Sequence, residues 1–522
     1  MGTTNSSSLF SLLLLLLAGI SMNTGYGQDF FVSPTGNNSN PGTVALPYLT
    51  IQYAVNAAKA GTRIYVMGGT YNEKVEFYKK EGTYTERIYL TNYQGQQVII
   101  DGGGYPQDQV GIENKATNAD CPAVLKPLIH ITDCSYVNIS GITIQNYYGN
   151  NAEGIRVEGS GTFVEINECT IKNIGWTSKK ELAPRLECHN AHGIRVIGTK
   201  STAIKELLIR NNEIYNCNTG FSESLTIVGN VDNFIISRNK VHHNTNIGIV
   251  AAGNYSWVTD WLPNEAGPTG IQNQARNGRI EENEVHHCST PAGIDKCAGI
   301  YVDGGAYIQV RRNKSYNNDR GFSIGCEQCD TADKKAFGNI LESNWAYLNN
   351  GPALVLGSNN NTPIEDSYVY NNSFNRNAQQ ANEARTEIFL QNNTNSRIRQ
   401  NIIVTNQLYD AGLAQYGTFK TKGLQSGYNL FWQKGNPGKA AADFYYAEDA
   451  ANPISGVDVA PGDPKFVSDT DLHLTANSTS AIDKGDPQFN SSVTNTPAHF
   501  VDIDNTPRIK GAAVDIGAHE YK

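Results

Sequence analysis

A short phrase recurs along the middle of the chain: an Asn, an apolar or aromatic residue soon after it, and a second Asn or a Cys. Its copies begin at Asn212, Asn239, Asn283, Asn313, Asn344, Asn372 and Asn401, so successive copies lie 27, 44, 30, 31, 28 and 29 residues apart. A nearly constant spacing with one long interval indicates a single structural unit that is repeated, with an insertion in one copy.

A second phrase, a Gly followed by alternating apolar residues, recurs at Gly154, Gly193, Gly220, Gly248, Gly299 and Gly321. Alternation over four to six residues is typical of half-buried β-strands, and the absence of long helical patterns between them argues against a doubly wound sheet. Short strands that stack coil upon coil form a parallel β-helix. We therefore predict an all-β, single-stranded parallel β-helix over residues 28–437, with the Asn side chains hydrogen-bonded along the stack.

Both ends fit this architecture. Residues 50–60 predict an amphipathic helix with Thr50 as its N-cap and Gly61 just past its end, and this helix would cover the first coil. From residue 438 to 522 the repeat fades, which predicts a C-terminal capping region. Asp502, Arg508 and Asp515 in that region predict ion pairs within the cap, and a catalytic trio is the alternative.

Residues 1–27 predict a signal peptide. Leu12–Leu17 begin a short apolar run and Gly25-Tyr26-Gly27 resembles a cleavage site, although no Lys or Arg precedes the run. We therefore expect export, either by secretion or to the periplasm or cell surface. The run is too short to span a membrane.

Composition narrows the class of partner. The chain has 41 Lys and Arg against 50 Asp and Glu, a formal charge of −9, which excludes a generally basic nucleic-acid-binding surface. Nine Cys are present, so at least one stays unpaired in an exported protein. Cys326 and Cys329 form a lone CxxC, for which a local disulfide or free thiols are favoured over zinc.

The helix followed by Gly69-Thr70-Tyr71, the Asn phrases and the ending Val514–Tyr521 resemble exported right-handed parallel β-helix proteins of the pectate-lyase-like superfamily. The resemblance covers nearly all of the mature chain. It implies a right-handed coil and, because many members are carbohydrate-active, a polysaccharide or oligosaccharide partner. Fold alone does not define the reaction.

In the Gly phrase, the first and third residues after the Gly are apolar, for example Ile300 and Val302. We expect these residues to face the interior. The alternate positions then face outward. These positions are occupied by Arg156, Glu158, Arg195, Tyr301, Asp303, Ser323 and Glu327. Glu223 falls on the inward phase, which predicts either a local bulge or a buried acid with a perturbed pKa.

Asp303 and Glu327 are the predicted catalytic pair. Gly299 and Gly321 are 22 residues apart, or one coil, so their strands should lie about 4.8 Å apart, with a two-residue offset of about 6.7 Å between the acids. The Cα atoms would be about 8 Å apart, and the carboxyl groups between about 5.5 and 8 Å. Either value suits glycoside hydrolysis, the shorter one with retention and the longer one with inversion.

The pair also resembles the β-helix β-xylosidase family, in which an Asp on one coil is the nucleophile and a Glu on the next is the acid/base. The resemblance implies these roles for Asp303 and Glu327, although the CxxC around Glu327 departs from the pattern. The alternative is that Asp303 starts a turn and Glu327 is a solvated side chain.

The long interval in the repeat contains an insertion, Asn254–Asn277, with Trp257 and Trp261. These rings could form the wall of a sugar-binding cleft or pack on the loop's own scaffold. His242 and His286 occupy the same place in their phrases and should stack alongside Tyr215 and Tyr316. A structural ladder is favoured there over a metal site, with His286 also a candidate contact to substrate.

Three functions follow, in order of preference. The first is a monomeric glycoside hydrolase without metal or cofactor, whose substrate-binding residues are Arg156, Arg195, Tyr301, Trp257, Trp261, Glu223 and His286. The second is a polysaccharide lyase, which needs Ca²⁺ or Arg to neutralise a uronate and a Lys, Arg or His as base. Its candidates are Arg156, Arg195, Lys296, Arg311 and Arg320, with Asp295 or Glu284 for Ca²⁺. The third is a non-catalytic carbohydrate-binding surface protein.

Overall fold

The computed structural model describes most of the chain. The described residues are 27–104, 109–260, 270–292, 296–360, 362–380, 384–406, 411–416, 421–487 and 501–521. Residues 1–26 of the predicted signal peptide, Trp261 and Asp295 lie outside them.

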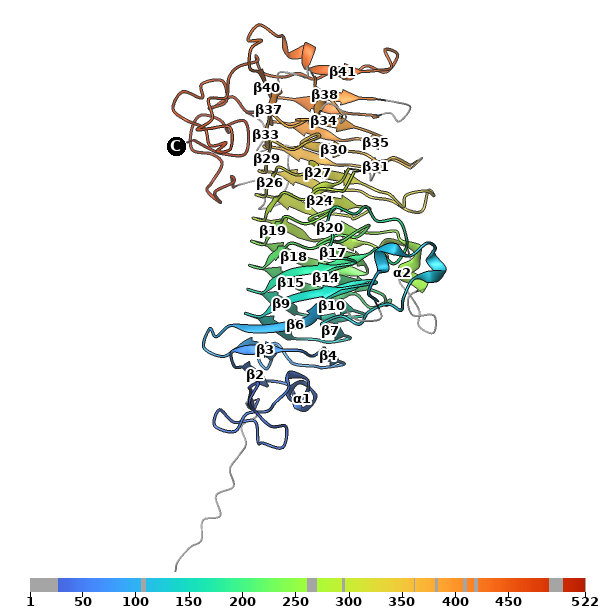
Figure 1. Ribbon diagram of the computed structural model, residues 1–522. Coiled ribbons are helices and arrows are strands. Elements are labelled where there is room, and N and C mark those ends of the chain that lie inside the picture. Colours follow the sequence, from blue (N-terminus) through green and yellow to red (C-terminus); the bar gives the residue numbers. More distant parts are fainter. Residues whose placement is uncertain are drawn as a thin grey trace, which may run out of the picture.

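Short parallel strands wind into one long right-handed β-helix (Figure 1). Strands that follow one another in the chain belong to different sheets, and each pairs with the strand one coil away. All pairings between the named strands of the described residues are parallel, and they form three long sheets of 15, 12 and 12 strands and one short pair. The predicted all-β parallel β-helix is therefore confirmed.

Sheet 1 contains β1 (Asp29–Val32), β2 (Arg63–Val66), β5 (Ile88–Asn92), β8 (Val137–Ser140), β11 (Gly161–Thr162), β12 (Val164–Asn167), β15 (Ile204–Arg210), β18 (Val231–Ser237), β21 (Ala275–Arg276), β22 (Arg279–Glu281), β25 (Gln309–Arg311), β28 (Ile340–Glu342), β32 (Tyr368–Tyr370), β36 (Arg397–Arg399) and β39 (Gln425–Gly427).

Sheet 2 carries Asp303, one of the two predicted catalytic acids. It contains β4 (Val75–Tyr78), β7 (Ile129–Thr132), β10 (Ala152–Glu158), β14 (Ala191–Gly198), β17 (Leu225–Gly229), β20 (Ile249–Ala252), β24 (Ala298–Asp303), β27 (Arg320–Gly325), β30 (Leu354–Leu356), β34 (Thr386–Leu390), β38 (Ala411–Gln415) and β41 (Tyr445–Ala447).

Sheet 3 contains β3 (Gly69–Tyr71), β6 (Val98–Gly104), β9 (Thr143–Tyr148), β13 (Thr170–Gly175), β16 (Glu213–Tyr215), β19 (Lys240–His242), β23 (Glu284–His286), β26 (Lys314–Tyr316), β29 (Trp345–Tyr347), β33 (Ser373–Asn375), β37 (Ile402–Thr405) and β40 (Leu430–Gln433). The short pair is β31 (Ile364–Glu365) with β35 (Asn393–Thr394).

One continuous hydrophobic core fills the inside of the coils from Phe30 to Phe444. Ile300 and Val302 of β24 belong to this core and are almost fully buried, as the alternation predicted. Tyr301 and Asp303 therefore project from the opposite face of sheet 2, because successive side chains of a strand point to opposite faces.

A ladder of buried Asn side chains runs along the turn between sheets 1 and 3. From Asn239 onward, each Oδ1 accepts the backbone N–H and the side-chain amide of the Asn one coil earlier, at 2.8 to 3.0 Å. The Oδ1 of Asn212 accepts the Cys169 N–H. Its members are Asn212, Asn239, Asn283, Asn313, Asn344, Asn372, Asn401 and Asn429, and Asp458 accepts both donors of the last one. The predicted role of the Asn phrase is confirmed.

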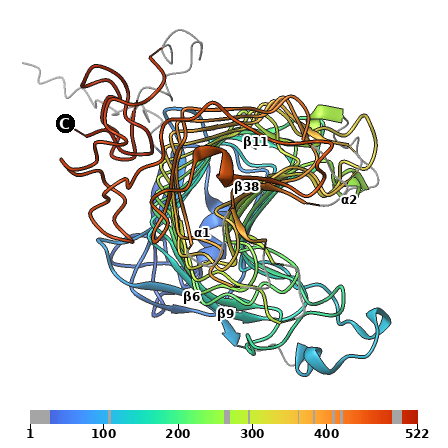
Figure 2. The same ribbon diagram turned by 90° about the horizontal axis from the view of Figure 1, so that it is seen from above.

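The N-terminal helix α1 (Ile51–Ala57) lies at the first coil, and the view along the axis shows it across the middle of the solenoid (Figure 2). The Thr50 side chain accepts the Tyr53 N–H, which confirms the predicted N-cap. The helix ends earlier than predicted, because Ala58 already has extended backbone dihedrals. Ile51, Ala54 and Val55 face the core and cover its first layer.

The last part of the chain has two roles. The short helix η5 (Ala441–Phe444) and β41 complete the final coil, where Phe444 stacks on the core residue Phe431. The residues after β41 then lie along the side of sheet 3 (Figure 1). There Arg508 donates to Ser343 Oγ at 2.7 Å, and Asn371 donates to the Asp515 carbonyl oxygen.

Asp502, Arg508 and Asp515 are buried inside this C-terminal segment. Asp502 Oδ1 accepts the Thr506 N–H, and Asp515 Oδ1 accepts the Asp483 N–H. Arg508 donates to the carbonyl oxygens of Gly517 and Ala518. Hydrogen bonds to backbone groups, rather than the predicted ion pairs, are thus the contacts by which these three residues hold the segment together.

One assignment of the repeat is wrong. The phrase at Gly220 is not a strand: Gly220 has φ +67° and pairs with Asn190 in an isolated antiparallel bridge. The strand of this coil is β17, in which Leu225 pairs with Ile194. Phe221 and Glu223 therefore lie in the connection before the strand, so the inward or outward phase assigned to Glu223 does not apply.

Two disulfides are present among the described residues, Cys121–Cys188 and Cys326–Cys329. The second confirms a local disulfide as one of the two expectations for the CxxC. Five cysteines keep free thiols, and four of these are buried. No helix in the described ranges combines the length and the apolar character that crossing a bilayer would require.

The Asn ladder can be tested with Asn313→Ala. The substitution removes the acceptor of the Asn283 N–H and side-chain amide and leaves both donors buried. We expect the free energy of unfolding to fall by about 3 kcal/mol in urea denaturation. Asn436→Ala, at an exposed Asn outside the ladder, is the control and should be nearly neutral. An equal effect of the two substitutions would contradict a stabilising ladder.

Candidate functional site

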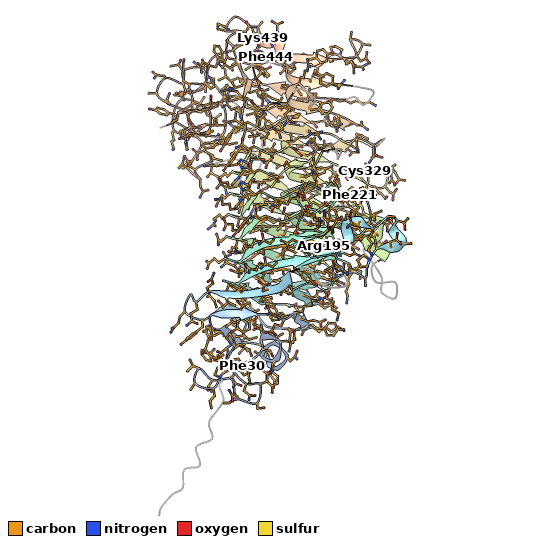
Figure 3. The ribbon with its side chains drawn as sticks, viewed as in Figure 1. Phe30, Arg195, Phe221, Cys329, Lys439 and Phe444 are labelled. Carbon is orange, nitrogen blue, oxygen red and sulfur yellow. A yellow bond between two sulfur atoms is a disulfide. The ribbon has the colours of Figure 1, made fainter. Side chains whose placement is uncertain are left out.

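A cavity of about 350 Å³ opens on the outer face of sheet 2, over β14, β17, β20 and β24. Arg195 and Phe221 line it, and both lie in the middle coils, close to Cys329 and far from Phe30 and Phe444 at the two ends (Figure 3). The described residues thus place the cavity where the insertion after β20 projects from the solenoid.

The floor of the cavity is apolar. Val228 of β17 and Val250 and Ala252 of β20 project outward and are buried. They belong to a second apolar cluster with Ile197 and Val258, the latter on helix α2 (Ser256–Asp260). The helix therefore covers an outward face that would otherwise be exposed to water.

Asp303, the last residue of β24, is buried at this cavity, 2% exposed. Its Oδ1 accepts the Glu327 N–H at 2.7 Å, and its Oδ2 accepts the Tyr255 hydroxyl at 2.6 Å. The Tyr301 hydroxyl also hydrogen-bonds to this carboxyl group. Burial raises the pKa of Asp303, and these donors partly oppose that shift.

Glu327 follows β27 and is exposed at the mouth of the cavity. Asp303 pairs with Gly325 in the sheet, so Glu327 lies two residues beyond the paired position, as the repeat predicted. The disulfide between Cys326 and Cys329 closes the short loop that carries it.

The Tyr255 hydroxyl links the two acids. It lies 2.6 Å from Asp303 Oδ2 and 3.5 Å from Glu327 Oε2, so these two oxygens are at most about 6.1 Å apart (2.6 plus 3.5). Burial, and then the charges of Asp303 and Glu327, raise the pKa of Tyr255 far above its ordinary value. The phenol therefore stays protonated and acts as a hydrogen-bond donor.

Glu223 is a third acid in the same cavity. The Thr226 hydroxyl donates to its Oε2 at 2.8 Å. Burial raises the pKa of Glu223 to about 7, against the opposing effects of Thr226 and Arg195. A pKa near 7 means that at neutral pH this group divides between its two protonation states.

A buried ion-pair network lies below the cavity. Glu153 accepts Arg156 Nη2 at 2.8 Å and Arg195 Nη1 at 3.1 Å. Burial favours the neutral acid, but the charges of Arg156 and Arg195 outweigh it and lower the pKa of Glu153 to about 2. Trp257 lies over the Arg195 guanidinium, 5.2 Å from its carbon to the ring centre. Arg195 is thus held between Glu153 and an aromatic ring.

His192 also lines the cavity, and the sequence did not single it out. Its Nδ1 is 3.1 Å from the Thr226 hydroxyl oxygen. Burial, followed by the charge of Arg195, lowers the pKa of His192 to about 3. The ring is therefore neutral. Its signal in the sequence is its place one residue before Gly193, which matches Glu153 before Gly154.

The structure gathers six predicted site residues around this cavity: Glu223, Arg195, Tyr301, Asp303, Glu327 and Trp257, which is 37% exposed. Arg156 lies outside the cavity lining and pairs with Glu153 and Glu158. His286 lies on sheet 3, away from the cavity. Trp261 belongs to the residues that are not described.

No family model matches the sequence. The chain is similar to YwoF, an uncharacterized protein of Bacillus subtilis strain 168, with 31% identity over 359 residues, 67% of this chain and 64% of YwoF. It is also similar to the pectate lyase PEL9 of Emericella nidulans, with 37% identity over 109 residues, 21% of this chain and 25% of PEL9. The chain thus spans less than two thirds of the length of either curated relative.

Similar solved structures include the pectate lyase Pel9A, with 14% identity and a TM-score of 0.46 over 95% of this chain and 96% of Pel9A. The complex of XylC with xylose has 11% identity and a TM-score of 0.48 over 94% of this chain and 98% of XylC. A GH136 lacto-N-biosidase from Eubacterium ramulus and a rhamnogalacturonan lyase are also among the similar structures, with TM-scores of 0.47 and 0.43. The assignment of the β-helix rests on the strand pairing of this chain itself.

The raised pKa of Glu223 makes stability depend on pH. Between the ordinary pKa near 4.5 and the folded value near 7, the folded protein binds more protons than the unfolded chain, so stability falls as pH rises through this range. Glu223→Gln removes this loss. From about pH 4 to about pH 8, we expect the variant to gain about 3 kcal/mol relative to the parent in urea denaturation.

The control for this titration is Glu81→Gln, at an exposed acid outside the cavity. Its pH dependence should match that of the parent. A Glu223→Gln profile parallel to the parent's would contradict a raised pKa at Glu223.

Proposed function

We propose that this protein is an exported glycoside hydrolase that cleaves a polysaccharide or its oligosaccharides with retention of configuration, with Asp303 as nucleophile and Glu327 as acid/base. The observation that supports it best is the hydroxyl of Tyr255 between the two carboxyl groups, which limits the oxygens that it contacts to a separation of about 6.1 Å. Retaining enzymes have carboxyl groups about 5–5.5 Å apart, whereas inverting enzymes leave about 6.5–9.5 Å for a water.

The environments of the two acids suit these roles. Asp303 is buried and fixed by donors on both oxygens, so it can be held against the sugar ring without rotating. Glu327 is exposed at the rim, where a leaving group departs and a water can enter. A retaining mechanism needs this difference, because one acid attacks while the other transfers protons.

The reaction would proceed in two steps. Asp303 attacks the anomeric carbon while Glu327 donates its proton to the glycosidic oxygen, so the bond to the leaving group breaks as an ester forms. Glu327 then takes a proton from water, whose oxygen attacks the same carbon. The ester bond breaks, Asp303 leaves as a carboxylate, and Glu327 is protonated again.

The rest of the cavity fits a sugar ring. Trp257 presents a partly exposed ring, and Val228, Val250 and Ala252 form an apolar floor. Glu223, Arg195, His192 and the Tyr301 hydroxyl offer polar partners for sugar hydroxyl groups. We propose no metal or cofactor for this reaction and a monomeric enzyme.

Export is part of the proposal. The predicted signal peptide and the two disulfides support an oxidising compartment outside the cytoplasm.

A polysaccharide lyase is the second candidate, because of the similarity to PEL9. A second cavity of about 270 Å³ shares Tyr301 and Glu327 with the first and is lined by Lys296 and Arg320. These cations could oppose the carboxylate of a uronate, the first requirement of β-elimination. Such a reaction would use Ca²⁺ or these cations and would leave an unsaturated uronate in the product.

A glycan screen with the secreted chain separates the two candidates, with reducing ends and ultraviolet absorbance recorded together. A hydrolase releases reducing ends without the absorbance of an unsaturated uronate and keeps its activity in chelator. Asp303→Asn should lower kcat/KM at least about a thousand-fold. Asp330→Asn, at an exposed acid in the loop after β27, should retain the parent rate. Unsaturated products, or an active Asp303→Asn, would overturn the proposal.

The role of Glu327 can be separated from that of Glu223 by azide rescue on aryl glycosides with good leaving groups. Glu327→Ala should slow breakdown of the ester, and azide should restore turnover by forming a glycosyl azide of retained configuration. Glu223→Ala should show no such product. The reverse result would assign the acid/base role to Glu223.

A further inference from the structure

The dipeptide His-His occurs twice at one place in the repeat, as His242-His243 and His286-His287. His242 of β19 pairs with His286 of β23, one coil away. His243 and His287 follow at the turn, both with φ +54°. The four rings therefore meet on the outer face of sheet 3, far from the residues that line the cavity on sheet 2.

The rings form two stacked columns. His242 and His286 are parallel at 4.9 Å between ring centres, and His243 and His287 are parallel at 4.7 Å. The first column continues through Tyr215 on one side and Tyr316 on the other, which confirms the predicted aromatic ladder.

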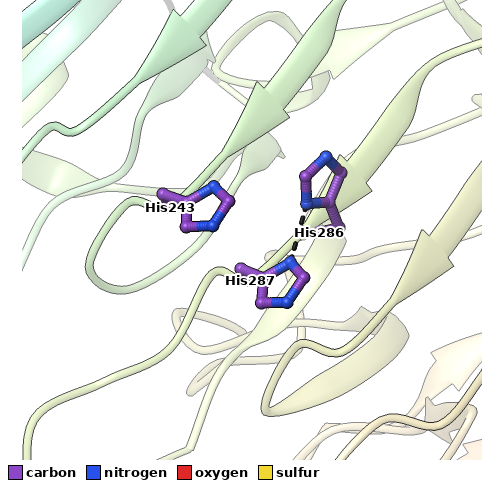
Figure 4. Close-up of side chains that lie close together, drawn as sticks. All are labelled: His243, His286 and His287. Carbon is purple, nitrogen blue, oxygen red and sulfur yellow. Dashed lines mark hydrogen bonds between the residues drawn. The ribbon is translucent and has the colours of Figure 1, made fainter.

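Within each pair the rings are nearly perpendicular and their Nδ1 atoms face each other at 2.8 Å. Figure 4 shows this contact between His286 and His287, with His243 beside them. Two imidazoles that share one hydrogen bond through these nitrogens cannot both be protonated there. One Nδ1 of each pair therefore has a lone pair, and transfer of the other ring's proton to its own Nε2 frees the second Nδ1.

The separation of the two nitrogens specifies a coordination angle. An ion about 2.05 Å from both atoms would make an N–metal–N angle of about 86°, close to the right angle of square-planar and octahedral sites. A tetrahedral ion would need these nitrogens about 3.3 Å apart. The spacing thus favours Cu²⁺ and Ni²⁺ over Zn²⁺.

We propose that His286 and His287, with His243 as third ligand, form a binding site for a divalent transition-metal ion of the Cu²⁺ or Ni²⁺ type on the outer face of sheet 3. Ligand nitrogens of these three residues lie within 4.8 Å of one another. His243 is exposed, so its ring can turn to bring a nitrogen to the same ion.

The charged side chains around the four His rings bear on how many metal ions the site can hold. His242 Nε2 lies 3.1 Å from Glu213 Oε1, and Glu284 accepts the hydroxyl of Tyr316, so two carboxylates border the column. Lys180 donates to the His243 carbonyl oxygen and opposes a cation. Two divalent ions one coil apart would repel strongly, so one ion per chain is expected.

A second group, His473, Asp504 and His519 in the C-terminal segment, also brings three possible ligands together. It is less suited to a metal. The Leu474 N–H donates to His519 Nδ1, so the neutral ring carries its proton on Nε2, the nitrogen that faces Asp504. This group provides the internal control.

The test is calorimetric titration of the untagged chain with CuCl₂, NiCl₂ and ZnCl₂ at pH 7, with electron paramagnetic resonance of the Cu²⁺ form. We expect one equivalent of Cu²⁺, nitrogen hyperfine structure, and tighter binding of Cu²⁺ and Ni²⁺ than of Zn²⁺. The double variant His286→Phe, His287→Asn should bind Cu²⁺ at least about tenfold more weakly. Phe preserves the stack, and Asn tolerates the positive φ.

His473→Gln should bind Cu²⁺ as the parent does, and circular dichroism should show that both variants are folded. Equal Cu²⁺ affinity in the double variant and the parent, or loss of binding in His473→Gln alone, would overturn the proposal. Tighter binding of Zn²⁺ than of Ni²⁺ would overturn the assignment of the ion. None of these readouts depends on the reaction catalysed at the cavity on sheet 2.

Discussion

The buried Asn ladder is the constraint on which the rest of the structure depends. Each rung satisfies a backbone N–H and a side-chain amide of the previous coil inside a turn that water cannot reach. A slip of one residue would leave these groups unpaired and would also turn the core face of every strand outward. The ladder and the alternating core residues therefore enforce the same register, and each coil is placed over the last with matching side chains above one another.

That register positions the catalytic candidates. Asp303 ends β24 because Gly304 next to it takes φ +76°, and its pairing with Gly325 brings the following turn of β27 over it. Glu327 lies in the loop that the Cys326–Cys329 disulfide closes, and this loop places it at the same cavity. The site therefore combines two kinds of support. A rigid sheet holds the buried Asp303, and a short cross-linked loop holds the exposed Glu327.

The repeat was sufficient to predict the β-helix, the Asn ladder and the offset between Asp303 and Glu327, because these follow from residues that recur at fixed spacing. Where the repeat breaks, prediction failed. The residues after Gly220 fit the Gly phrase in sequence, but Gly220 has a positive φ and lies in a turn. The strand of this coil begins at Leu225 instead. The hydroxyl of Tyr255 that joins the two acids comes from the insertion, whose path over sheet 2 no periodicity describes.

In a solenoid, side chains at equivalent positions of successive coils lie next to one another, as the backbones do. A residue that occupies one place in the repeat faces its counterpart one coil away at about 4.8 Å, so a doubled feature becomes a contact. On sheet 2 this brings Arg156 beside Arg195, and the buried Glu153 between them is needed to hold two like charges together. On sheet 3 it brings His242 over His286, where the two rings stack in parallel. When the repeated side chain is an Arg, which is always charged, an acid is needed between the two copies. When it is a His, the two copies can stack as neutral rings and keep nitrogen lone pairs for a ligand.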